Sequence, residues 1–344
     1  MLKQFSKLNI RNFHYKILNT GFPQTINQVE KNSQCYCQKL NATILSESDD
    51  SEKIDINIKL PNKLLEYKKH VLLISPMGKT DSKSPFVWEK GWGSKIEDNT
   101  NWPYSTINIL KNHLKDKNIN SGILINAISV HERNSNHIIS NLIREKNNSP
   151  ITNVAGSNDQ TCQFLVIPEM KIYNINKQDL SKFGDFITQE FEAKMPIKLS
   201  FDDYLKGNAE LILKENKSSP INSYNHFKFT GTSIDSNWIF ICGHKERDMR
   251  CGIIGKDIAR KIEKDNLLAN YNVAIISHVG GHKFAGNVIL YTNEDQNSTE
   301  GSKAVDTLWL GKVTPENITC ISNHFTKREI PSEYLRGHTV LKAK

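Results

Sequence analysis

Short apolar runs alternate with amphipathic segments along the chain, and polar or glycine-rich residues separate them. A run of four to eight apolar residues is typical of a buried strand, whereas apolar residues three or four apart indicate a helix with one buried face. Strands are predicted at residues 70–75, 122–128, 163–175 (one or two strands), 237–241, 271–277, 287–291 and 304–311. Helices are predicted at residues 105–117, 137–146, 178–192, 252–264 and 317–323. This alternation predicts an α/β fold.

The pattern divides the chain into two α/β domains, and 344 residues are enough for two domains of ordinary size. The first domain is expected at 61–200 with a thioredoxin-like fold, and the second at 226–344. A polar linker at 201–225, which contains Pro220, separates them. Residues 30–60 are polar and form a flexible linker ahead of the first domain.

The N-terminal segment, residues 1–29, contains no aspartate or glutamate. On a helix, its basic side chains share one face and most of its apolar residues fall on the other. These basic residues are Lys3, Lys7, Arg11 and His14. A basic, acid-free, amphipathic start is typical of a mitochondrial transit peptide, and a plain disordered terminus is the alternative. We therefore expect a mitochondrial protein, in the matrix and/or the intermembrane space.

Composition and charge exclude several classes. With 38% hydrophobic and 24% charged residues, the chain is an ordinary folded protein. The net charge of +8 is spread along the sequence and lies partly in the first twenty residues, which disfavours nucleic-acid binding. No run approaches 18 apolar residues, so no membrane span is expected. Three tryptophans, Trp88, Trp92 and Trp102, are expected to pin a long loop onto the core.

Six cysteines in a chain of this size do not indicate a disulfide scaffold. Cys162 lies in an apolar run and is expected to be a buried strand cysteine. Cys35 and Cys37 form a C-x-C pair that is redox-active or incidental. A thiol oxidoreductase built on this pair is disfavoured, because the flanking strand and helix of a thioredoxin-like active site are missing.

The remaining chemistry concentrates between residues 242 and 282. Cys242 ends an apolar run, and Cys251 opens the helix that follows. His278 ends the next predicted strand, and a Gly-Gly turn brings His282 back beside it. Adjacent parallel strands present such connections at the same edge of a sheet, so the two pairs are expected to converge. Two cysteines and two histidines at one edge predict a metal site.

Residues around these ligands fit the same prediction. Gly280 and Gly281 allow tight turns and close backbone approach, which exposes N–H donors to cluster sulfides. Arg247, Arg250 and Lys283 are expected to offset the negative charge of thiolates and sulfides. We expect these five residues to surround the metal and its ligands.

The spacing bears on which metal is bound. Structural zinc accepts two cysteines and two histidines, but its cysteines are usually two to four residues apart. Eight residues separate Cys242 from Cys251, which suits a two-iron cluster better. Rieske centres also use two cysteines and two histidines. Cys242-Gly243-His244 imitates the first Rieske box, but no C-x-x-H box follows, so His244 is not expected to be a ligand.

Two stretches carry a family resemblance. They are Gly-His-x-x-Arg-Asp-x-Arg-Cys-Gly at 243–252 and His-x-Gly-Gly-His-Lys-Phe-Ala-Gly-Asn at 278–287. The chain resembles the sucrase/ferredoxin-like family of fungi, strongly over 225–344 and thinly before it. The resemblance implies a thioredoxin-like ferredoxin fold for the C-terminal domain. It also implies a [2Fe–2S] cluster held by Cys242, Cys251, His278 and His282.

The function implied by the resemblance is electron transfer or redox sensing in mitochondrial redox quality control, with unidentified redox proteins as partners. Imidazole ligands raise the reduction potential relative to four thiolates. A zinc-stabilised protein-interaction module without redox activity is the alternative. No general base or substrate pocket is recognisable in the sequence, so a non-catalytic role is favoured over an enzyme.

Overall fold

The computed structural model describes residues 14–18, 58–61, 64, 66–76, 89–117, 122–131, 160–192, 228–234, 236–293 and 304–343. Several predictions fall outside the described residues. These are the leader residues 1–13 and 19–29, the linker at 30–60 apart from 58–60, the helix at 137–146, the linker at 201–225, the C-x-C pair Cys35 and Cys37, and Trp88.

Within the described residues, one ten-stranded sheet organises the fold, in the order β12-β10-β9-β7-β8-β3-β2-β4-β5-β6. Its N-terminal strands are β2 (Tyr67–Ile74), β3 (Gly122–His131), β4 (Thr161–Ile167), β5 (Lys171–Asn176) and β6 (Thr232–Ser233). Its C-terminal strands are β7 (Asn237–Cys242), β8 (Tyr271–Ile276), β9 (Val288–Asn293), β10 (Ala304–Leu310) and β12 (Leu335–Lys342). Only the pairs β2–β3 and β7–β8 are parallel among the pairings of these strands.

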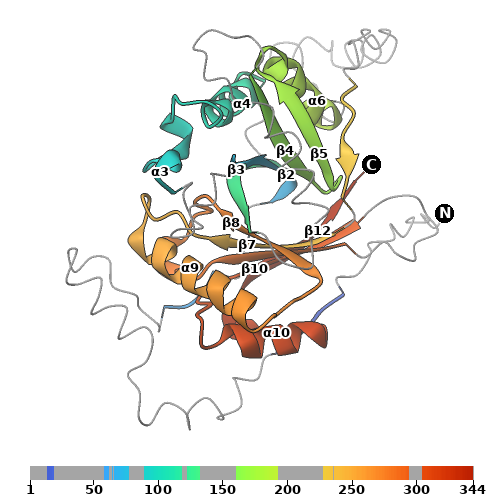
Figure 1. Cartoon of the computed structure of the whole chain (residues 1–344). Helices are drawn as coiled ribbons and strands as arrows, with labels where there is room; N and C mark the ends of the chain where they lie inside the picture. Colours follow the sequence, from blue (N-terminus) through green and yellow to red (C-terminus); the bar gives the residue numbers. More distant parts are fainter. Residues whose placement is uncertain are drawn as a thin grey trace, which may run out of the picture.

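The same arrangement occurs in both halves of the chain. In each, a strand, a helix and a parallel strand are followed by two antiparallel strands and a helix, as in thioredoxin-like domains. The described helices are α3 (Glu89–Trp92), α4 (Ser105–Asp116), α6 (Leu180–Glu192), α9 (Met249–Lys264) and α10 (Ile318–Thr326). In Figure 1, α4 and α6 lie beside β4 and β5, while α9 and α10 cover the opposite end of the molecule. The predicted α/β, thioredoxin-like fold is confirmed.

The two halves join through β3 and β8, which pair antiparallel from Ile128 opposite Ile276 to His131 opposite Val273. Backbone hydrogen bonds extend this seam, because Ser277 N–H donates to Ala127 O over 2.8 Å. The sheet therefore runs unbroken through both predicted domains. Parallel strands inside a sheet are covered on both faces, and the cores of β2 and β7 are accordingly apolar and buried.

The predicted elements agree closely with the described ones, and three differences have physical causes. The run at 163–175 forms two strands, β4 and β5, separated by a turn at 168–170. Helix α9 begins at Met249 instead of 252, because the Asp248 side chain accepts a hydrogen bond from Arg250 N–H and caps the helix. Strand β12 was not predicted, because its exposed residues interrupt the apolar pattern.

Part of the expected leader belongs to the folded body. Lys16–Leu18 forms strand β1, which pairs in parallel with β11 (Glu329–Pro331), so these residues are extended where the amphipathic pattern suggested a helix. Tyr15 is buried, stacks on Phe325 at 4.9 Å between ring centroids, and shares a 3.1 Å hydrogen bond with Thr292. This burial favours the strand over a solvated helix.

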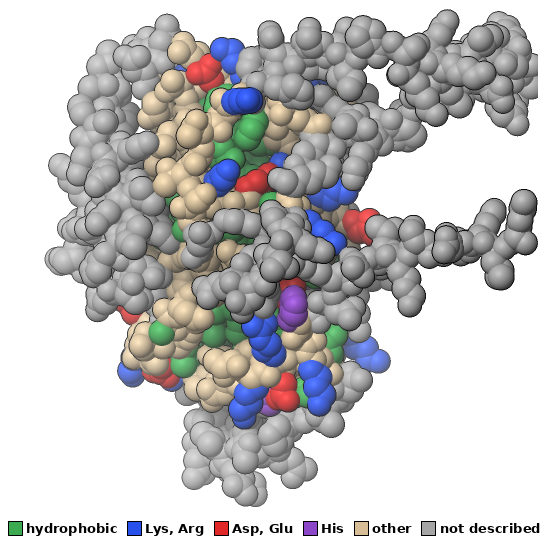
Figure 2. All heavy atoms as spheres, turned by 90° about the vertical axis from the view of Figure 1, so that its right-hand side faces the viewer, with side chains coloured by type: hydrophobic (Ala, Val, Ile, Leu, Met, Phe, Trp, Pro, Cys, Tyr) green, Lys and Arg blue, Asp and Glu red, His purple; other side chains and the backbone are tan. Residues whose placement is uncertain are grey.

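Other expectations concern the surface and the loops. Trp92 is fully buried and donates to Ser75 Oγ over 3.0 Å, and Trp102 packs against the core, so both pin their loop as predicted. Cys162 is buried, also as predicted. No helix in the described part of the chain is long and apolar enough to cross a membrane. On the face drawn in Figure 2, basic side chains lie interspersed with acidic ones.

Candidate metal centre

The two cysteines are delivered by the ends of two packed elements. Cys242 is the last residue of β7, and Cys251 lies in the first turn of α9. Both are essentially inaccessible, at 1% and 0% exposure. The connection between them stays close to the sheet, because Gly243 N–H donates to Ile276 O over 3.2 Å. A Cβ on Gly243 would meet Ile275, so the close approach requires glycine.

The two histidines come from the loop after β8. Donor atoms of Cys242, Cys251 and His278 all lie within 4.8 Å of one another. The rings of His278 and His282 stack with centroids 5.7 Å apart and planes at 29°. His282 itself opens a short 3-10 turn, is exposed, and lies outside the 4.8 Å group. The structure thus brings three predicted ligands together, with the fourth directly against the third.

This donor set fits a soft or borderline metal. His278 Nδ1 is buried and has no hydrogen-bond partner among the described residues. A buried polar atom of this kind is costly unless something binds it. Thiolates and imidazoles are the ligands that zinc and iron–sulfur clusters take. The described part of the chain therefore contains a Cys/Cys/His cluster that can bind a metal.

Electrostatics divide the two cysteines into a thiolate and a thiol. The Cys251 thiol hydrogen-bonds Cys242 and, with help from His278, holds the pKa of Cys242 well below its ordinary value despite burial. The same hydrogen bond and burial raise the pKa of Cys251. The pair therefore shares one proton in the metal-free protein, and metal binding would displace it.

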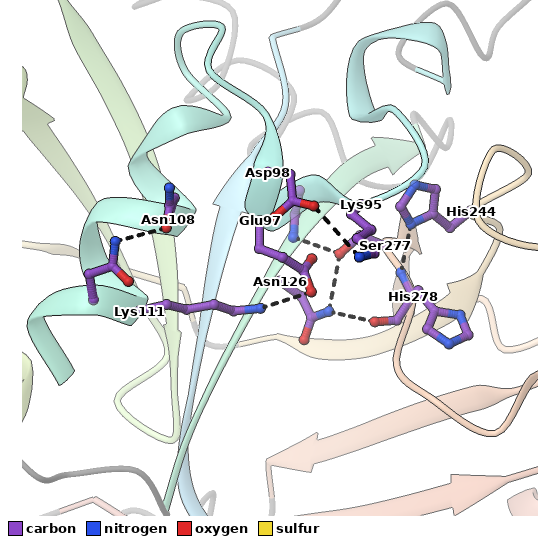
Figure 3. A network of polar contacts seen from close by, with 11 residues as sticks. Lys95, Glu97, Asp98, Asn108, Lys111, Asn126, His244, Ser277 and His278 are labelled. Atoms are coloured by element: carbon purple, nitrogen blue, oxygen red, sulfur yellow. Dashed lines mark hydrogen bonds and ion pairs between the residues drawn. The ribbon is translucent and has the colours of Figure 1, made fainter. Parts of the chain in front are cut away.

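His244 is not placed as a ligand, because both of its ring nitrogens are used. Nε2 donates to Gly93 O over 2.6 Å, and Nδ1 accepts from His278 N–H over 3.2 Å. The ring also meets Trp92 edge-on at 5.4 Å. Burial lowers the pKa of His244, which favours the neutral tautomer that this arrangement requires. His244 thus holds the backbone of His278, as Figure 3 shows.

The predicted surrounding residues have separate roles. Arg250 is buried and forms a two-pronged ion pair with Asp248, with N–O distances of 2.7 and 3.0 Å. Arg247 and Lys283 are exposed, so solvent screens their charges. Gly280 and Gly281 have φ of 78° and 71°, conformations that favour glycine. A Cβ on Gly281 would lie 2.7 Å from Arg336.

Arg336 is the residue that the sequence did not reveal. It is 9% exposed and donates to Asn287 Oδ1 over 2.7 Å and to Gly280 O over 3.3 Å. Burial lowers its pKa, while the nearby Cys242 and Cys251 raise it. A guanidinium from β12 thus lies beside the cysteines. Only the run Leu335-Arg336-Gly337, with a charge next to glycine at a strand start, could have drawn attention to it.

Residues 60–337 match the model of the sucrase/ferredoxin-like family. The chain belongs to the sucrase/ferredoxin-like family. The match includes both halves of the sheet, whereas the sequence motifs suggested a strong resemblance only over 225–344. The candidate metal centre lies within the matched region of this family member.

Relatives of this family member include proteins named altered inheritance of mitochondria protein 32. The one from Candida glabrata is 38% identical over 306 residues, which cover 88% of this chain and 87% of the relative. That from Saccharomyces cerevisiae is 33% identical over 329 residues, 94% of each chain. That from Saccharomyces kudriavzevii is 33% identical over 326 residues, again 94% of each. These names are consistent with the mitochondrial localisation expected from the N-terminal segment. No solved structure matches the chain significantly.

Proposed function

We propose that this chain is a mitochondrial [2Fe–2S] protein that transfers electrons or senses redox state. Cys242 and Cys251 would hold one iron, and His278 and His282 the other. The observation that carries the proposal is the pairing of the ligands: two buried cysteines with sulfur atoms within 4.8 Å of each other, beside two stacked histidines. A two-iron cluster takes its ligands as two pairs, one on each iron.

The charges around the site support a redox role. A cluster with two thiolates and two neutral imidazoles is neutral when oxidised and carries one negative charge when reduced. A buried negative charge is costly unless a positive group offsets it. Arg336 is buried, which lowers its pKa, and the nearby Cys242 and Cys251 oppose that lowering because their negative charge favours the guanidinium. The site therefore favours the reduced form more than a neutral surrounding would.

The two sides of the site differ in access. Cys242 and Cys251 are buried, whereas His282 is exposed and His278 is half-buried. Electrons and protons would therefore be exchanged on the histidine side, where a redox partner protein can approach. Protonation of imidazole ligands would couple the reduction potential to pH. By family resemblance, we propose mitochondrial redox quality control as the process served.

The test is anaerobic purification of the full chain, followed by iron, acid-labile sulfide and visible and EPR spectra. We expect about two irons and two sulfides per chain. We also expect an EPR signal that appears on reduction, with average g below that of the free electron. Colourless protein that contains zinc and no labile sulfide would contradict the proposal.

A zinc-stabilised interaction module is the second candidate, and one observation favours it. Three donor atoms within 4.8 Å of one another are also compatible with a single ion that takes its fourth ligand from nearby. Against zinc, His282 lies outside this group, and eight residues separate the cysteines. Metal content decides between the two candidates.

A further inference from the structure

His278 is held at both of its backbone polar groups. Its N–H donates to His244 Nδ1 over 3.2 Å, and its carbonyl accepts from Asn126 Nδ2 over 3.1 Å. Asn126 Nδ2 also lies 3.1 Å from Ser277 Oγ, the side chain of the residue before His278. Asn126 belongs to β3, in the N-terminal half of the chain. Figure 3 shows Asn126 and His244 on either side of the peptide that carries the histidine.

Asn126 is in turn held by a buried histidine. His70 Nε2 lies 3.1 Å from Asn126 Oδ1, and since that oxygen can only accept, Nε2 carries the proton. His70 Nδ1 then accepts from the Tyr291 hydroxyl over 2.8 Å. His70 is fully buried, and burial lowers its pKa to about 4, so the ring is neutral near pH 7.

The hydrogen bonds continue across the molecule in one direction. Tyr67 and Tyr291 share a 2.9 Å hydrogen bond between their hydroxyls. Trp309 Nε1–H donates to the Tyr67 hydroxyl over 2.9 Å. Because an indole can only donate, the Tyr67 hydroxyl accepts from Trp309 and can donate to Tyr291. The Tyr291 hydroxyl in turn donates to His70. The order is Trp309, Tyr67, Tyr291, His70, Asn126 and the His278 carbonyl.

We propose that the N-terminal half positions the metal centre: Asn126 fixes the backbone of His278, and the chain from His70 to Trp309 fixes Asn126. Partners that orient a metal ligand typically change metal affinity by 10–100-fold when removed. A fully satisfied buried network is also rigid, because each member has one arrangement that satisfies its neighbours. This inference rests on the proposed metal centre, and it gives the first half of the chain a role in it.

The experiment measures binding of Co²⁺ to the metal-free full chain, and cluster retention after reconstitution. Asn126→Leu keeps the side-chain size but removes all three side-chain hydrogen bonds, to His278 O, Ser277 Oγ and His70 Nε2. We expect Co²⁺ affinity about 10-fold or more below that of the wild type. We also expect faster loss of the cluster to a chelator, and a shifted EPR spectrum. The matched control is Gln163→Leu, which removes a buried amide whose 2.8 Å hydrogen bond to Asn174 lies away from the site. It should bind Co²⁺ like the wild type.

A second pair of variants covers the case in which Asn126→Leu does not fold. His70→Gln retains a donor for Asn126 and an acceptor for Tyr291, whereas His70→Leu retains neither. We expect His70→Gln to restore most of the affinity and the EPR spectrum that His70→Leu loses. Equal behaviour of His70→Gln, His70→Leu and wild type would overturn the positioning role while leaving the metal centre intact. A wild type that binds neither Co²⁺ nor a cluster would refute the metal centre itself.

Discussion

At the scale of single residues, charge and hydrogen bonding decide the properties of the site. The pKa of Cys242 lies well below its ordinary value, because the Cys251 thiol and the nearby His278 favour the thiolate despite burial. His278 contributes a buried Nδ1 with no hydrogen-bond partner among the described residues. Arg336 adds the buried positive charge. Each of these features can be removed by a single substitution, and each substitution is expected to change a different measurable property of the site.

Replacing Arg336 with Gln should lower the midpoint potential of the proposed cluster. A buried guanidinium near the proposed cluster would stabilise the added electron, and about 1.4 kcal/mol of such stabilisation corresponds to roughly 60 mV for one electron. A redox titration measures the shift. Lys283→Gln is the control, since Lys283 is exposed and screened and should change the potential little. An unchanged potential in Arg336→Gln would mean that the arginine serves packing alone.

Replacing His282 with Cys should also lower the midpoint potential, by more than Arg336→Gln does, and should make that potential less dependent on pH. A thiolate adds a negative charge that opposes reduction, and it removes one titrating imidazole. Redox titrations at pH values from about 6 to 9 measure both effects. The same curve for variant and wild type would argue against ligation by His282.

The buried His70 should make the protein less stable in mild acid. Its folded pKa of about 4 lies below its unfolded value of about 6.5, so the unfolded chain binds more protons between these values. Stability therefore falls as pH drops through this window, by up to about 3 kcal/mol from this group. Denaturant unfolding across pH 4–7 should show that the free energy of unfolding depends less steeply on pH in His70→Gln than in the wild type. The same pH dependence of stability in the wild type and in His70→Gln would indicate that His70 is not neutral and buried.

At the scale of elements, strand ends and helix starts place the predicted ligands. Cys242 ends β7, Cys251 lies in the first turn of α9, and His278 follows β8. These positions could be predicted from the sequence because β7 and β8 are almost continuous runs of apolar residues, which is typical of strands buried on both faces. Arg336 was missed because its partners, Gly280 and Asn287, lie about fifty residues away, and no local pattern encodes such a contact.

The N-terminal strand gives a stability prediction. Deleting residues 1–13 leaves β1 and Tyr15 in place, so this deletion is the control for the longer one. Deleting residues 1–18 removes β1 and the buried Tyr15, and Tyr15→Ala alone should cost about 3 kcal/mol. Thermal unfolding of the three variants measures this. Equal melting temperatures for the two deletions would show that the strand does not stabilise the fold.

Strand β1 also limits where a mitochondrial leader can be cleaved. A transit peptide cleaved at the predicted end, residue 29, would remove β1 and leave β11 without its partner. Since Tyr15 and His14 contact the folded body, we expect cleavage before His14. N-terminal sequencing of the protein from mitochondria measures the position. A mature protein that begins after Leu18 would contradict this expectation.

At the scale of the whole molecule, one sheet joins two similar halves. The sequence predicted two α/β domains, but it gave no information on the β3–β8 pairing, because antiparallel register between distant strands depends on the tertiary fold. This pairing and the His278–Asn126 contact tie the two halves together. We therefore expect one cooperative transition, in which tryptophan fluorescence and cluster absorbance change at the same denaturant concentration. Two separated transitions would indicate independent halves.

The central claim is that two cysteines and two histidines share a two-iron cluster. Pulsed EPR of the reduced protein, prepared with ¹⁵N-labelled histidine, tests it most directly. The account predicts strong couplings to two histidine nitrogens, one of which disappears in His282→Cys and the other in His278→Cys. A reduced cluster without coupled histidine nitrogens, or a protein that holds only zinc, would contradict it.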